Sequence, residues 1–295
     1  MLLKKVREGV GQLVVAVLPT LKIWWFLLKK NPVALGGGFV LFLIMLLGLL
    51  APVLTRYDPT QPDARAILLP PSTRHLMGTD DLGMDIFTRV IYGARLEFLF
   101  AFFAVIGASI VGCIYGVISA FYGGWLDELM MRFLDSLQAF PGLLLGMALA
   151  AALRPSARNV IIVLIVVNFP IYARLVRSQA LSLKQATFVD AARVVGNNDF
   201  RIIFKYLLPN ALGPIYVTAS LNIGWTVLMA SSLSFVGLGV PAPTPEWGLM
   251  VSQGARHMIF GKWWPSFFPG LFIFLFVLAA NLFGDGLRDL LSRRR

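Results

Sequence analysis

Few side chains in this sequence could carry out chemistry, and they form no catalytic or metal-binding pattern. The chain has two histidines, His75 and His257, and one cysteine, Cys113, inside an apolar run. Neither histidine has a metal-binding partner at a suitable spacing, and a lone cysteine in an apolar run usually acts as a small apolar side chain. The pair Gly261-Lys262 is followed by tryptophan, so it is no phosphate-binding P-loop. The sequence predicts no catalytic residue, no metal site and no cofactor on this chain.

Three aspartates come closest to a site-like pattern. Asp80, Asp81 and Asp85 stand near enough together to suggest a cation site, but three arginines share their stretch: Arg74, Arg89 and Arg95. Because carboxylates next to guanidinium groups tend to form ion pairs, we expect local ion pairs here rather than a cation site. Asp80 or Asp81 is also available to cap a helix.

The composition indicates a membrane protein. Of the 295 residues, 58% are hydrophobic and 14% charged, and the mean hydropathy is +0.76. A typical soluble domain has about 25% charged residues, so the composition excludes a disordered chain, a fibrous protein and nearly every soluble enzyme. The net charge of +11 fits the excess of Lys and Arg in cytoplasmic loops, and little soluble surface is left for binding nucleic acid.

Six apolar runs are long enough to cross a membrane, which takes roughly 20 residues in a helix. They are expected at 33–55, 98–122, 130–153, 157–176, 211–232 and 264–287. The predicted fold class is therefore all-α and integral to the membrane, with six transmembrane helices in one domain at 33–295. An N-terminal segment at 1–32 precedes that domain.

The apolar stretch at 10–28 is a seventh candidate span. Lys22 lies in its middle and Pro19 interrupts it, and a central lysine costs roughly 2.5–3.5 kcal/mol on insertion. We interpret this stretch as an amphipathic segment on the membrane surface, with Trp24 and Trp25 at the headgroups. A true span is the main alternative.

Basic residues set the expected orientation. Six spans place both termini on one side, and most of the 26 Lys and Arg residues fall there: in the N-terminal segment, at the C-terminal end and in the loop at 178–209. This side is predicted to be cytoplasmic, so 56–97 and 233–263 lie outside. In the second outer segment, three prolines stiffen the sequence PAPTPEWG. Its Glu246 and Trp247 are candidates for docking an outer partner, or Trp247 anchors the headgroup region.

The predicted spans carry polar residues but no ionisable residue near their centres. This disfavours an ion-coupled carrier, which usually needs such groups at mid-membrane. Asn168, Asn222 and Asn281 either line a wet pathway or form hydrogen bonds between helices. Two pairs of glycines have the GxxxG spacing that allows helices to approach closely: Gly112 with Gly116, and Gly142 with Gly146. We expect packing within the fold from them, rather than a subunit interface.

The cytoplasmic loop at 178–209 is the most informative segment. Its first half has a helical apolar stripe, Gly196-Asn197-Asn198 breaks the helix, and Asn198 or Asp199 can cap a second short helix. Pro209 then ends that helix before the fifth span. Ala191 and Ala192 leave a small, smooth surface that another protein could approach closely. Residues alone predict a helix-turn-helix at the membrane surface.

The spacing within this loop resembles a known family. The loop has the order Asp190-Ala191-Ala192, three residues, Gly196, nine residues and Y-x-L-P. This order resembles the EAA loop of ABC-importer permeases, whose pattern is EAA-x3-G-x9-I-x-LP. Leu208 and Pro209 match, while Asp190 replaces Glu and Tyr replaces Ile. GTDDLGMDIFTRVIYGAR, SLSFVGLGVPAPTPEWGLM and NLFGDGLRDLL are similar, in order, to segments of the dipeptide/oligopeptide/nickel permeases. Met84 departs where that family has Arg.

The resemblance implies the second of that family's two permease types, with the type I importer fold of six helices. It implies a homologous second permease, two cytoplasmic ATPases that bind ATP and Mg, an outer substrate-binding protein and a bacterial or archaeal cytoplasmic membrane. The ATPases would grip the loop at Asp190, Ala191, Ala192, Arg193, Gly196, Leu208 and Pro209 and drive alternating access. Ala192→Arg is then expected to abolish uptake by blocking the ATPase cleft. This chain itself would be no enzyme.

A stand-alone channel or secondary carrier is the alternative, although the EAA-like loop would have no role in it. The substrate lies beyond the sequence. Members of the family carry peptides, nickel chelates, glutathione, opines and oligosaccharides, and the uncharged spans slightly favour peptides.

Overall fold

The chain folds into helices joined by short connections and one long loop at 55–85. The structure, a computed structural model, describes residues 31–292, and side chains as far as 289. The predicted surface segment at 10–28 lies outside these residues. The described helices are α2 (Pro32–Leu54), α3 (Ile86–Tyr122), α4 (Gly124–Gln138), α5 (Gly142–Ala152), α6 (Ala157–Leu183), α7 (Thr187–Val194), α8 (Asp199–Arg201), a π-helix (Ile202–Leu207), α9 (Leu208–Ala211), α10 (Gly213–Phe235), α11 (Trp247–Met258) and α12 (Trp264–Ser292).

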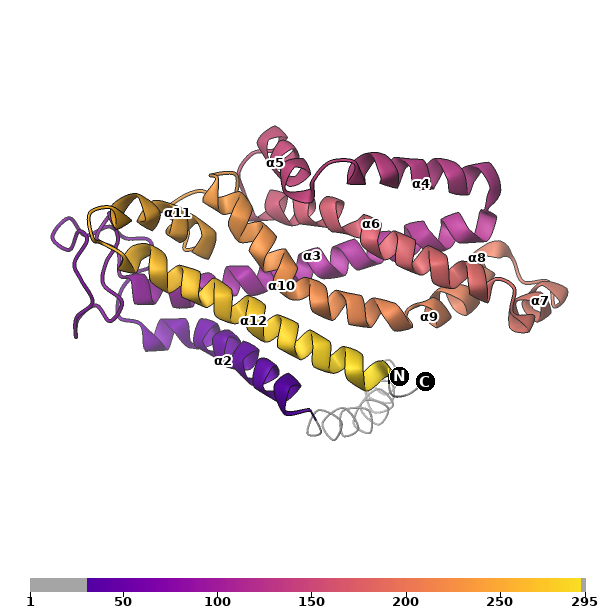
Figure 1. Ribbon diagram of the computed structural model, residues 1–295, viewed down its shortest axis with the longest axis horizontal. Helices are drawn as coiled ribbons and strands as arrows, with labels where there is room; N and C mark the ends of the chain where they lie inside the picture. The colour runs from indigo at the N-terminus through magenta and orange to yellow at the C-terminus, as the bar shows by residue number, and fades with distance from the viewer. Residues whose placement is uncertain (1–30, 293–295) are drawn as a thin grey trace, which may run out of the picture.

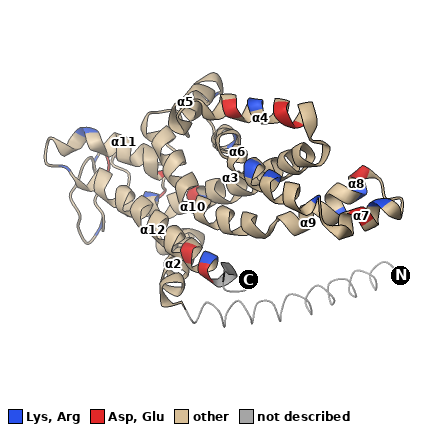
Figure 2. Cartoon of the chain, turned by 45° about the vertical axis from the view of Figure 1, so that its right-hand side comes forward, with Lys and Arg blue, Asp and Glu red and all other residues tan. Residues whose placement is uncertain are grey.

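Long helices run side by side along the molecule (Figure 1). α3 extends through most of its length, with α6 and α10 beside it; α2 and α12 pair on one side, and α4 lies on the other. The loop 55–85 and α11 form one end, while α7 and α8 form the opposite end. In Figure 2, residues coloured as charged lie mostly toward the two ends and along α4, with a few on α3 and α6, and most of the long helices is coloured as uncharged.

The described helices accommodate the six expected spans. Four are long and apolar enough to cross a membrane: α2, α3, α6 and α12. Two bent pairs bring the number to six if each is one span: α4 with α5, bent by 89°, and Asp199–Ala211 with α10, bent by 59°.

Several helix boundaries differ from the expected spans. α3 begins at Ile86, roughly three turns before 98, because the Asp85 side chain accepts a hydrogen bond from Thr88 N and caps it there. α6 continues to Leu183 rather than ending at 176. The expected helix at 130–153 is two helices, because Pro141 has no N–H and disfavours helical geometry in the residue before it.

The glycines of α3 lie where α3 crosses α6. A Cβ on Gly112 would stand 2.6 Å from both the Phe169 carbonyl oxygen and the Tyr172 Cβ, and one on Gly116 would collide with the Ala173 carbonyl oxygen. The backbones of the two helices therefore touch at these positions. The expected role of this GxxxG pair, close packing within the fold, is confirmed. Gly142 and Gly146 have looser surroundings, with a Cβ meeting only side-chain atoms, among them Met229.

Candidate functional site

The predicted helix-turn-helix forms one end of the molecule. α7 ends at Val194, and Gly196 turns the chain with a φ of +81°, which a residue with a Cβ rarely adopts. The backbone N–H and the side-chain amide of Asn197 both donate to the Ala192 carbonyl oxygen, at 3.1 and 2.9 Å. Asn198 then caps α8 by accepting from Arg201 N at 3.0 Å. Both ends of the turn are therefore held by specific hydrogen bonds.

The two adjacent alanines of this segment face opposite ways. Ala192 is buried with Val189 in the cluster that joins α3, α6 and the π-helix, whereas Ala191 is exposed with Asp190 and Arg193. Asp190 and Arg193 approach each other to 3.5 Å on the surface. The expectation that Ala192 offers its side chain to a partner is therefore wrong, because that side chain is already packed inside.

Apolar side chains are exposed to solvent around the turn. Val194 is 88% exposed and Val195 81%, and Phe200 of α8 is also exposed. Together with Ala191 they form what we name the tip surface: Ala191, Val194, Val195 and Phe200. The sequence signal for it was present, since two valines stand directly before the turn glycine in an otherwise polar stretch.

Pro209 shapes the connection from this segment to α10. Proline cannot donate the hydrogen bond that a helix interior requires, and the backbone just before it widens into the π-helix, where Leu208 N–H bonds to the Ile203 carbonyl oxygen. π-Helical turns of this kind are rare and often occur at functional sites. The chain then bends by 59° into α10.

Polar contacts fasten this end to the long helices. Lys184, just after α6, donates through Nζ to the Phe121 carbonyl oxygen at 2.5 Å. Arg177 of α6 donates through Nε and Nη2 to the two carboxylate oxygens of Asp127 on α4, each at 2.6 Å, which is a bidentate pair. These contacts tie the residue after α6 to the end of α3, and α6 to α4.

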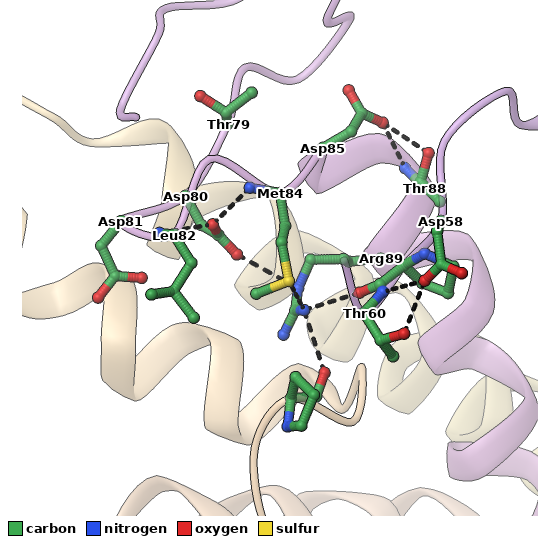
Figure 3. A network of polar contacts seen from close by, with 12 residues as sticks. Asp58, Thr60, Thr79, Asp80, Asp81, Leu82, Met84, Asp85, Thr88 and Arg89 are labelled. Atoms are coloured by element: carbon green, nitrogen blue, oxygen red, sulfur yellow. Dashed lines mark hydrogen bonds and ion pairs between the residues drawn. The ribbon is translucent and has the colours of Figure 1, made fainter. Parts of the chain in front are cut away.

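At the opposite end, a buried arginine ties the loop at 55–85 to the segment before α11 (Figure 3). Arg89 of α3 donates through Nη1 to the carbonyl oxygens of Pro59, at 2.8 Å, and Pro243, at 3.1 Å. Its Nε lies 3.4 Å from Asp80 Oδ2, and Asp80 Oδ1 accepts from Leu82 N and Met84 N. Burial raises the pKa of Asp80, and Arg89 opposes this shift. The expected local ion pair is confirmed.

The helix cap in this stretch is Asp85 rather than Asp80 or Asp81. Asp85 Oδ2 accepts from Thr88 N at 2.8 Å, and Oδ1 lies 2.9 Å from His75 Nδ1. In the described part of the chain, no three His, Cys, Asp or Glu side chains are grouped so that they could hold a metal ion.

We predict that Arg89→Met destabilises the protein by about 3–5 kcal/mol, because it leaves Asp80 buried without its cation and cuts the ties to Pro59 and Pro243. Thermal unfolding in detergent measures this. Arg74→Gln, which alters an exposed arginine of the same loop, is the matched control. A melting temperature for Arg89→Met that equals that of Arg74→Gln would contradict the prediction.

Comparison with known proteins shows the family to which the chain belongs. The profile of the family described as "binding-protein-dependent transport system inner membrane component" matches residues 108–295, well over half of it. The chain belongs to this family. The N-terminal transmembrane domain of oligopeptide transport permease C also matches, at residues 20–71. The protein is therefore a permease subunit of an ABC importer, an all-α membrane protein, and no ATPase domain is indicated in it.

Relatives of the permease are similar over nearly its full length. The dipeptide transport permease DppC of Alkalihalophilus pseudofirmus is 47% identical, over 90% of this chain and 87% of that protein. The probable D,D-dipeptide transport permease DdpC of Escherichia coli is 42% identical, over 92% and 90%. The glutathione transport permease GsiD of Pectobacterium atrosepticum is 38% identical, over 91% and 89%.

A solved structure supports the fold. A chain of the inward-facing MetNI methionine ABC transporter aligns with a TM-score of 0.54 at 18% identity, over 70% of this permease and 97% of that chain. Together with the family match, this likeness confirms the type I importer fold expected from the sequence.

Glu246 and Trp247 of the permease lie in its interior. Both are 0% exposed. Glu246 caps α11 by accepting from Gly248 N and Leu249 N, and Trp247 Nε1 donates to the Val90 carbonyl oxygen at 2.8 Å. The expectation of direct docking contacts from these two side chains does not fit this geometry, nor does a headgroup role for Trp247. Trp247 holds the start of α11 against α3, and Glu246 caps that helix.

The three asparagines expected in the pathway have different surroundings. Asn168 is buried and its amide donates to the Leu164 carbonyl oxygen of its own helix at 2.7 Å. Asn222 of α10 donates to the Tyr172 hydroxyl of α6 at 3.0 Å, which is a hydrogen bond between helices. Asn281 of α12 is exposed. Asn281 is thus the one of the three whose side chain is exposed in this structure, and a pathway role for it stays a prediction.

Sequence reasoning missed Glu97 as well as the tip valines. The Glu97 side chain is 0% exposed and faces the start of α11. The signal available was its position at the edge of the long apolar run from 98 onwards, where a carboxylate is unusual.

Proposed function

We propose that this permease moves di- or oligopeptides into the cell as the transmembrane subunit of a complex with a homologous second permease, two cytoplasmic ATPases and an outer substrate-binding protein. ATP and Mg bind to the ATPases. Both termini and the segment 178–209 face the cytoplasm, and the segments 56–97 and 233–263 face outward. Substrate passes by alternating access, driven by the ATPases.

The tip surface is the observation that carries this proposal. Its two valines are more than four-fifths exposed and lie beside Phe200 and Ala191. They stand at the end of the long helices, next to a turn whose shape is fixed by Gly196 and Asn197. An apolar surface in water favours contact with another protein. Its attachment through Lys184 to α3 gives that partner a mechanical route into the spans.

The residues of the coupling segment have distinct roles in this proposal. Ala191 gives the partner close approach, Asp190 and Arg193 flank the contact with charge, and Gly196 sets the turn. Leu208 and Pro209 set the angle at which α10 leaves the segment. Ala192 and Val189 hold α7 against the body of the permease.

Peptides are favoured as the substrate because the relatives named above are described as dipeptide, D,D-dipeptide and glutathione permeases. The hydrogen bonds of Arg89 give the loops at that end a defined shape, which supports docking of the substrate-binding protein there. A rigid surface lowers the entropic cost of docking.

Purification and uptake together test the proposal. The tagged permease is extracted from native membranes in mild detergent, and the proteins that co-purify are identified. Recovery of a second permease and two ATPases is expected, followed by ATP-dependent uptake of a labelled dipeptide in proteoliposomes supplied with the binding protein. Recovery of the chain alone, together with uptake that needs no ATP, would favour a stand-alone channel or carrier instead.

A further inference from the structure

Two glutamates from distant parts of the permease meet in its interior. Glu97 belongs to α3, and Glu246 stands directly before α11. Both side chains are 0% exposed, and their carboxyl groups lie at backbone N–H groups of three consecutive residues, 247–249. Buried carboxylates normally have a cation or enough donors to balance their charge, so this pair requires an explanation.

Both carboxyl groups point at the first turn of α11. Glu246 accepts from Gly248 N at 2.9 Å and from Leu249 N at 2.7 Å, one through each oxygen. Glu97 Oε1 faces Trp247 N at 3.4 Å. The other oxygen, Glu97 Oε2, is buried and lacks a donor among the described residues.

Among the residues that the structure describes, no cation contacts the pair. α3 contributes Glu97, α11 contributes Glu246, α10 contributes the hydroxyl of Ser234, and the Trp247 ring packs on Phe272 and Phe276 of α12. Two arginines of α3 are engaged elsewhere, Arg89 with Asp80 and Arg95 with the Gly48 carbonyl oxygen. Two adjacent buried carboxyl groups without a cation cannot both be ionised at modest cost.

We propose that Glu97 and Glu246 hold one proton between them, and that this proton fastens α11 to α3. A proton on Glu97 Oε2 turns the oxygen without a donor into a donor toward Glu246, while Glu246 keeps accepting from the first turn of α11. When α11 leaves α3, water reaches both groups and the proton passes to water.

The direction of the pH dependence follows from this exchange. The docked state binds a proton that the undocked state releases, so docking weakens as pH rises above the ordinary range of a glutamate. Burial, the largest influence, raises the pKa of Glu246, which agrees with this direction. The consequence for transport rests on the proposed function: α11 and the loops tied to it shape the outer face, so alkaline pH would loosen that face.

Hydrogen exchange tests the proposed proton shared by Glu97 and Glu246, which we name the proton latch. The permease complex in nanodiscs, without peptide or ATP, is compared with the variant Glu97→Gln, whose amide donates permanently in place of the shared proton. The exchange rate of the Gly248 and Leu249 amides in the wild type is divided by the rate in the variant at the same pH, which cancels the intrinsic pH dependence of exchange. Glu128→Gln, the same change at an exposed glutamate of α4, is the control.

We expect the wild-type to Glu97→Gln ratio to rise between pH 6 and pH 9, by up to about tenfold for each pH unit over which the docked pair keeps a proton that the undocked pair has released. The ratio to Glu128→Gln should stay flat. A ratio to Glu97→Gln that is also flat, or one that follows sodium concentration at constant pH, would overturn the proposal.

Infrared spectroscopy gives a second measurement should Glu97→Gln fold poorly. The wild type at neutral pH is expected to have the carbonyl band of a buried protonated carboxylic acid, and Glu246→Gln is expected to lose or shift it. Absence of that band in the wild type would also overturn the proposal. Neither measurement needs transport, so a failure of the latch is distinguishable from a failure of the proposed peptide import.

Discussion

Replacement of Ala191 with arginine is expected to abolish ATP-driven uptake while the permease stays folded. Ala191 is exposed on α7, so an arginine there extends into water and disturbs no packing in the isolated chain. In the complex, the same side chain would lie between α7 and the ATPase that we propose as its partner. A charge buried there without a counter-ion costs about 3–5 kcal/mol, which corresponds to more than a hundredfold in affinity.

The measurement is uptake of a labelled dipeptide together with ATPase co-purification. Ala191→Ser keeps the surface small and is the matched control, expected to stay within about twofold of wild type. The result to expect for Ala191→Arg is no uptake and little bound ATPase, with an unchanged melting temperature for the permease alone. Normal co-purification and uptake in Ala191→Arg would show that α7 does not meet the ATPase at this position.

The neighbouring alanine shows why sequence and structure disagree here. The local pattern of apolar, glycine and capping residues predicted the helix, the glycine turn and the second helix, since each depends on residues such as Gly196 and Asn198. It could not decide between Ala191 and Ala192, because the buried face depends on how α7 meets α3 and the π-helix. An arginine at Ala192 would therefore test packing rather than coupling.

At the start of α11, prediction from local sequence fails more clearly. Trp247 and Glu246 stand in a proline-rich segment that reads as an exposed loop, yet Trp247 is buried against Val90 and close to Gly93 of α3. Partners so far apart in the chain are invisible to local patterns. By contrast, the ion pair of Arg89 with Asp80 was predictable, because both residues share one short stretch of sequence.

Replacement of Gly116 with valine is expected to remove nearly all folded permease. A Cβ at Gly116 would overlap the Ala173 carbonyl oxygen and stand 3.0 Å from Arg177 N. Both are backbone atoms of α6, so no side-chain rotation relieves the collision, and the two helices must separate. Overpacking in a core typically costs 1–3 kcal/mol and occasionally more; contact with backbone places this case at about 3 kcal/mol or above.

Gly36→Val is the matched control, because Gly36 lies in α2 with nothing within 4 Å of an added Cβ. The yield of monodisperse protein and its melting temperature are the measurements, with loss expected for Gly116→Val and near wild-type values for Gly36→Val. Equal melting temperatures for the two variants would mean that α3 and α6 are not in backbone contact. Since α6 continues directly toward α7, the packing at Gly116 also fixes where the tip surface stands, and a milder Gly116→Ala is expected to lower uptake more than it lowers stability.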